Sequence, residues 1–202
     1  KEVSEEEVKN YLTENNSRIN YIKMELKDGE GNLLKSDGKA EIMEMAEGYV
    51  DRIKNGEDMN TVGNEYEKYY DALVEAAAET TDDGSEDTSA TAEETEEQIT
   101  DNTTVISKDG AAPSAAVVEK VFDGSVSTGD VFIVEEDEAY YVVEVLDLFA
   151  DENYLSDNES YVRHTLKDDE FDAEVESWTA AQNVVRNEAS YKRYKIKKFM
   201  EN

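Results

Sequence analysis

Few of the side chains that usually perform catalysis or bind metals occur in this chain of 202 residues. The chain has no cysteine and one histidine, His164, so thiolate nucleophiles, disulfides and sites built from several cysteines or histidines are excluded. Asp28, Glu30 and Asn32 have the alternating spacing of ligands in a calcium-binding loop, but Leu33 and Lys39 occupy positions where that loop needs glycine and glutamate. We therefore expect neither a metal site nor a cofactor, and we expect His164 on the surface or in helix packing.

Acidic side chains dominate the composition. The chain has 51 Asp and Glu against 20 Lys and Arg, a formal net charge of −31. Binding to a phosphate backbone needs a basic face, so we expect no nucleic-acid partner, and anionic lipid headgroups are disfavoured for the same reason. Carboxylates are so numerous that no single pair indicates a glycosidase, and no nucleophile constellation favours another hydrolase.

The hydrophobic pattern switches between helical and strand periods along the chain. Apolar residues at steps of three and four predict helices, while alternating or short runs of β-branched and aromatic residues predict strands. The expected helices cover residues 4–16, 36–55, 58–78, 113–124 and a stretch beyond 151, and the expected strands cover residues 19–26, 103–107, 131–134 and 139–145. We therefore predict an α+β fold in which helices pack on a small, mostly antiparallel four-stranded sheet.

Several helix ends have recognisable signals. Ser4 and Glu7 have the spacing of a capping box. Gly56 and Gly124 follow the apolar stripes that they are expected to end. Pro113, the only proline, is expected at the first position of its helix.

Residues 79–102 differ from the rest of the chain. They are mostly Ser, Thr, Asp, Glu and Ala, and no Lys or Arg occurs between Lys68 and Lys108. Such a segment cannot bury enough apolar surface to offset the entropy of ordering it, about 1–2 kcal/mol per residue. We expect a disordered acidic insertion whose ends stay close together.

The last quarter of the chain combines an apolar stripe with a basic end. Phe171, Val175 and Trp178 recur at helical spacing, which is more often typical of a core than of a partner groove. The basic residues that follow are Arg186, Lys192, Arg193, Lys195, Lys197 and Lys198. They suit a helix C-terminus and solubility, or alternatively an anionic partner.

The order of elements resembles that of the parvulin-type (PpiC-like, rotamase) domain. Residues 18–24 are similar to the first strand of that family, residues 46–59 with Gly56-Glu57-Asp58 to its helix pair, and residues 139–145 to its last strand. The flanks resemble those of lipid-anchored extracytoplasmic foldases of Gram-positive bacteria. The resemblance implies a linker helix at 1–16, a parvulin-like domain at 17–150 and a C-terminal helical segment at 151–202.

The same resemblance implies a function. It points to an extracytoplasmic foldase or chaperone at the cell surface, attached to the membrane only through an anchor outside this sequence. Its peptidyl-prolyl cis–trans isomerase-type domain would bind unfolded or proline-containing exported polypeptides.

The departures from the family bear on the site. Tyr21 and Tyr141 stand where the family has its two active-site histidines, and the family's Gly-Gly-Asp-Leu-Gly stretch is missing. We expect Tyr21, Phe122 and Tyr141 to line a peptide groove, with isomerase activity weak or lost. In the alternative, the tyrosines pack a core and the chain is a non-enzymatic structural or interaction module that keeps only the parvulin scaffold. The oligomeric state stays open.

Overall fold

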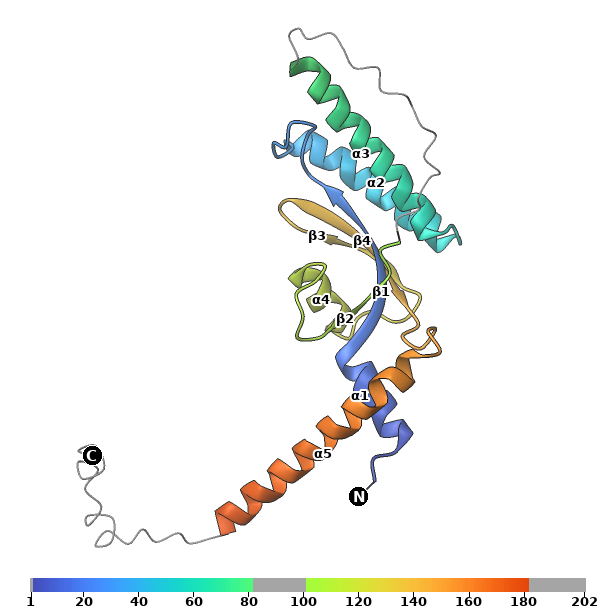
Figure 1. The fold of residues 1–202 in the computed structure, drawn as a ribbon. Coiled ribbons are helices and arrows are strands. Elements are labelled where there is room, and N and C mark those ends of the chain that lie inside the picture. The colour runs from blue at the N-terminus through green and yellow to red at the C-terminus, as the bar shows by residue number, and fades with distance from the viewer. Residues whose placement is uncertain (1, 82–100, 182–202) are drawn as a thin grey trace, which may run out of the picture. The chain divides into compact units, whose positions relative to one another are not determined.

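The computed structural model describes residues 2–81 and 101–181 of the chain. In these ranges the helices are α1 (Glu5–Asn15), α2 (Ser36–Lys54), α3 (Met59–Thr81), α4 (Ala115–Phe122) and α5 (Tyr154–Ala181) (Figure 1). The strands are β1 (Asn16–Glu25), β2 (Thr104–Ser107), β3 (Val131–Glu135) and β4 (Ala139–Leu146). The chain divides into two compact units, one formed by Lys9–Asp157 and the other by Lys1–Val8 with Asn158–Asn202.

The four strands form one sheet in the order β2-β1-β4-β3, and every pairing is antiparallel. The predicted α+β fold with a four-stranded sheet is therefore confirmed. The two central strands are β1 and β4, whose register places Ile22 opposite Val142. Strand β1 begins three residues before the predicted start, because its first residues pair with β2, from Asn16 opposite Ser107 to Ile19 opposite Thr104.

Helices α2 and α3 cover one face of the sheet (Figure 1). The strands present alternate residues to this face, because successive side chains of a strand point to opposite sides. Met24 and Val142 are fully buried there, together with Val62 of α3. Burial of each such side chain contributes about 1.5–3 kcal/mol, so this cluster is a main source of stability.

Helix α4 packs on the opposite face of the sheet. Its Val117, Val118 and Val121 are buried in a second apolar cluster with Ile19 of β1 and Val143 of β4. Both faces of the central strands are thus covered by apolar contacts, which explains why β4 consists almost entirely of buried residues.

The helix-end signals are confirmed with one exception. Gly56 and Gly124 adopt φ angles of 94° and 80°, which glycine tolerates best, and each follows the C-cap residue of its helix, α2 or α4. The prediction that Pro113 opens a helix is wrong. Ser114 is the N-cap of α4, and its side-chain oxygen accepts a hydrogen bond from the Val117 N–H at 3.1 Å. An N-cap side chain must accept a hydrogen bond from the helix, which proline cannot do. Pro113 therefore lies one residue before the N-cap Ser114.

The unit formed by Lys1–Val8 and Asn158–Asn202 contains the first turn of α1 and most of α5. The Ser4 hydroxyl accepts a hydrogen bond from the Glu7 N–H, and the Glu7 carboxylate accepts one from the Ser4 N–H at 2.7 Å, so the capping box is confirmed. His164 is exposed and pairs with Asp168 at 2.8 Å. The expectation that the stripe at Phe171 and Trp178 is core is wrong, because these side chains are 61% and 58% exposed.

Two predicted segments lie mainly outside the described residues. The acidic insertion at 79–102 is described only at its ends, where α3 continues to Thr81 and the chain resumes at Asp101. The continuation of the last helix beyond Ala181 lies wholly outside. Among the described helices, none combines the length and apolar character needed to cross a membrane.

Candidate functional site

Tyr21 and Tyr141 come together on the face of the sheet that α4 covers. Tyr21 lies opposite Val143 in the β1–β4 pairing and Tyr141 lies opposite Lys23, so the two tyrosines are diagonal neighbours on adjacent strands. Their ring centroids are 6.2 Å apart and the ring planes are inclined by 49°. This tilted arrangement is one that aromatic pairs favour.

The two tyrosines differ in burial, but the hydroxyls of both lack a hydrogen bond to the described residues. Tyr141 is only 5% exposed, whereas Tyr21 is half-buried. Neither hydroxyl forms a hydrogen bond to any described residue. No buried side-chain oxygen of the described residues lacks a partner, so the Tyr141 hydroxyl reaches solvent although its ring is buried. Burial raises the pKa of the Tyr141 phenol, which therefore stays protonated and able to donate at neutral pH.

The three predicted site residues line three different cavities. Tyr141 lines a cavity of about 540 Å³ together with Lys23 and residues 136–139. Tyr21 lines one of about 80 Å³ against α3. Phe122 lines one of about 340 Å³. All three side chains pack on the apolar cluster beneath α4, but each of these three cavities is lined by only one of them.

Charged groups border the cavity at Tyr141. Lys23 Nζ lies 2.6 Å from Glu25 Oε1. The hydrogen bond to Glu25 raises the pKa of Lys23, so this ammonium is charged next to the Tyr141 phenol. On the hairpin turn, Glu138 pairs with Lys27 at 2.7 Å. The cavity therefore presents one phenol, one ammonium and a turn rich in carboxylates to a ligand.

A polar group on the opposite face was missed by the sequence reasoning. Glu144 of β4 lies on the face that α2 and α3 cover, and burial raises the pKa of its carboxyl, with Asp58 adding a smaller like-charge effect. On β1, the paired residue Asn20 is only 5% exposed, and its side-chain N–H donates to the Asn60 Oδ1 at 2.8 Å. A single carboxylate inside the otherwise apolar strand β4 is the signal that could have located this pair.

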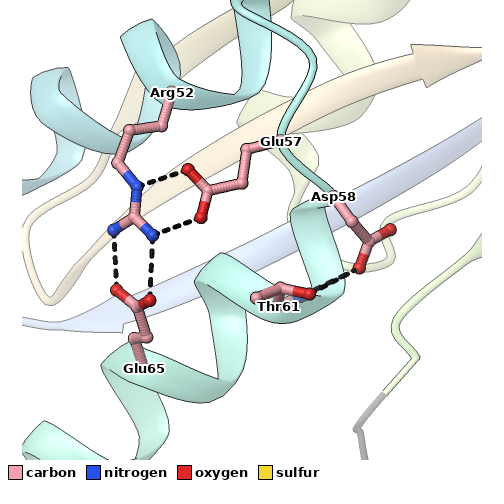
Figure 2. Close-up of polar contacts among 5 residues, drawn as sticks. All are labelled: Arg52, Glu57, Asp58, Thr61 and Glu65. Atoms are coloured by element: carbon pink, nitrogen blue, oxygen red, sulfur yellow. Dashed lines mark hydrogen bonds and ion pairs between the residues drawn. The ribbon is translucent and has the colours of Figure 1, made fainter.

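Arg52 connects α2 to the start of α3, as Figure 2 shows. Its guanidinium donates from Nε to Glu57 at 2.7 Å and from Nη1 to Glu65 at 2.6 Å, with a second bond to each carboxylate. These bonds raise the pKa of Arg52 and lower those of both carboxyls. Asp58 caps α3 by accepting from the Thr61 N–H at 2.9 Å. Glu57 and Asp58 thus hold the helix pair in place, and neither of them lines the cavities at Tyr21 and Tyr141 described above.

No group of three or more His, Asp or Glu side chains in the described ranges is placed to hold a metal ion. Comparisons of the chain with protein-family models, with curated proteins and with solved structures find no match. The site thus consists of two adjacent phenols on an antiparallel sheet, with a cavity at Tyr141 large enough for several side chains of a peptide.

Proposed function

We propose that this chain is a parvulin-like module that binds unfolded or proline-containing polypeptide on the sheet face that carries Tyr21 and Tyr141. The observation that carries the proposal is the contact between these two rings at 6.2 Å, on the two central strands, where the parvulin family carries its histidine pair. A cavity of about 540 Å³ at Tyr141 offers room for a peptide segment.

We further propose that isomerisation by this site is weak or absent. Rotation about a prolyl amide crosses a barrier of about 18–20 kcal/mol, and a catalyst must stabilise the twisted amide. A phenol hydroxyl can donate one hydrogen bond to that amide, but of the two tyrosines only Tyr141 lines the large cavity. With Tyr21 and Phe122 lining other cavities, a bound prolyl segment would meet too few groups for efficient catalysis.

The scaffold alternative has a specific observation in its favour. The Tyr141 ring is 5% exposed and packs in the apolar cluster with Val143 and Val118, as a purely structural tyrosine would. In that case the chain would be a non-enzymatic interaction module. We favour peptide binding because the Tyr141 hydroxyl reaches solvent and has no bond to a described residue, whereas a structural phenol in a core usually bonds to a neighbour.

The resemblance is also our basis for proposing where the protein works. Foldases of this type assist exported chains outside the cytoplasmic membrane and are held there by a lipid anchor. An anchor of that kind would lie outside the sequence described here.

The test is a titration of the ¹⁵N-labelled chain with an unfolded, proline-containing peptide, followed by NMR. We expect shifts of the amides in β1 and β4 next to Tyr21 and Tyr141. Exchange between the cis and trans signals of the peptide, measured in the same samples, should stay close to the uncatalysed rate. Shifts confined to other elements, or none at all, would contradict the proposal.

Matched variants separate binding from catalysis. Tyr21→Phe and Tyr141→Phe keep the rings and remove the hydroxyls, and Tyr161→Phe changes an exposed tyrosine of α5 as the control. Any acceleration of exchange should disappear in the first two variants and persist in the third. Acceleration that survives in the Tyr21→Phe/Tyr141→Phe double variant would show that the hydroxyls have no part in it.

A further inference from the structure

Helix α5 presents an apolar stripe that no described residue covers. Phe171, Val175 and Trp178 are 61%, 37% and 58% exposed. Their spacing of four and then three residues places them on one side of the helix. Large apolar side chains gathered on one exposed face typically mark a surface that something else covers.

The charges around this stripe limit what can cover it. Residues 168–176 contain six acidic side chains and no basic one. At 100° per residue, Asp172 and Glu174 lie on opposite sides of the stripe. Two copies of α5 packed through this face would bring their carboxylates together, so self-pairing is disfavoured. A fitting occupant is therefore both apolar and basic.

The same chain contains such a segment. Residues 191–199 carry five basic side chains, no acidic one and four large apolar ones. The apolar members are Tyr191, Tyr194, Ile196 and Phe199. The linking residues 182–190 can span up to about 30 Å when extended, whereas Phe171 and Trp178 are separated by only about 10 Å along the helix. The chain is long enough for the segment to reach every part of the stripe.

We propose that residues 191–199 dock on the Phe171–Val175–Trp178 face of α5. The basic side chains then lie against Asp172 and Glu174, and the apolar ones cover the stripe. The neighbouring opposite charges decide the orientation and the partner, and docking needs both this charge attraction and burial of the aromatic rings. This docking belongs to the smaller unit and does not depend on the function proposed for the sheet.

Trp178 is the only tryptophan, so its fluorescence reports directly on this face. We expect the emission of the 202-residue chain to lie at shorter wavelength, and to be quenched less by acrylamide, than that of a chain ending at residue 190. Raising the salt to about 1 M, where the Debye length is about 3 Å, should move the full chain toward the truncated one. Equal emission and equal quenching in both chains would overturn the proposal.

Charge reversal provides a test in the full-length chain. Lys195→Glu/Lys197→Glu should expose Trp178, and adding Asp172→Lys/Glu174→Lys should restore its protection. Lys54→Glu/Lys108→Glu makes the same change in net charge within the other unit and should leave the emission unchanged. Protection that appears only as the protein concentration rises would mean that a second molecule covers the stripe, which contradicts docking within one chain. Failure of the reciprocal reversal to restore protection would also contradict it.

Discussion

The phenol rings of Tyr21 and Tyr141 lie 6.2 Å apart on the two central strands of the sheet, and neither hydroxyl bonds to a described residue. The two rings therefore pack in the apolar cluster beneath α4, while the hydroxyls are available to form hydrogen bonds with a ligand. Substitutions that remove the ring and the hydroxyl separately can distinguish these contributions.

We expect Tyr141→Phe to change the free energy of unfolding by less than about 0.5 kcal/mol, because no intramolecular hydrogen bond is lost. Tyr141→Ala should cost about 3–5 kcal/mol, because it leaves a cavity in the cluster beneath α4. Urea unfolding followed by circular dichroism measures both values. Tyr66→Phe is the matched control, since the Tyr66 hydroxyl donates to the Glu25 carbonyl at 3.3 Å and its loss should cost about 0.5–1.5 kcal/mol. A large cost for Tyr141→Phe would show that its hydroxyl has a structural partner.

Glu144→Gln should stabilise the fold at neutral pH. Burial raises the pKa of Glu144 above its value in the unfolded chain, so the folded state binds the proton more tightly. The ionised carboxyl therefore destabilises the fold above the folded pKa, and this penalty disappears below the unfolded value of about 4.3. Unfolding measured from neutral pH down to acid should show the variant more stable at the upper end and equal at the lower end. A difference that does not depend on pH would contradict this origin.

Arg52→Lys should lower stability slightly, and the loss should shrink as salt is added. A lysine amine cannot bind Glu57 and Glu65 with two parallel hydrogen bonds each, as the planar guanidinium does. The Arg52 side chain is 35% exposed, so solvent screens part of the interaction. Thermal unfolding at low salt and at about 1 M salt measures the effect. A loss that is equal at both salt concentrations would indicate a packing role for Arg52 instead.

Most of the fold could be predicted because its local signals agree with one another. Alternation in β1, the dense apolar run of β4 and the glycines after α2 and α4 all indicate the same elements. The prediction failed at Pro113, where two signals compete: proline favours the first helical turn, but the neighbouring Ser114 is the better cap.

The candidate site was less predictable, because it depends on packing between distant elements. The pairing of β1 with β4, strands more than a hundred residues apart in the sequence, brings Tyr21 to Tyr141. The cavity that Phe122 lines depends on where α4 ends and how the following loop returns, which periodicity does not encode. The partners of Arg52 lie 5 and 13 residues away across a turn, so no helical spacing indicates them.

The sheet order has a consequence for how this chain acquires its fold. Strand β1 is flanked by β2 and β4, and its longest pairing is with β4, more than a hundred residues later in the sequence. During synthesis, which starts at the N-terminus, β1 therefore lacks its partner β4 until almost the whole Lys9–Asp157 unit has been made. Such high contact order slows folding and leaves an open strand edge exposed to other chains in the meantime.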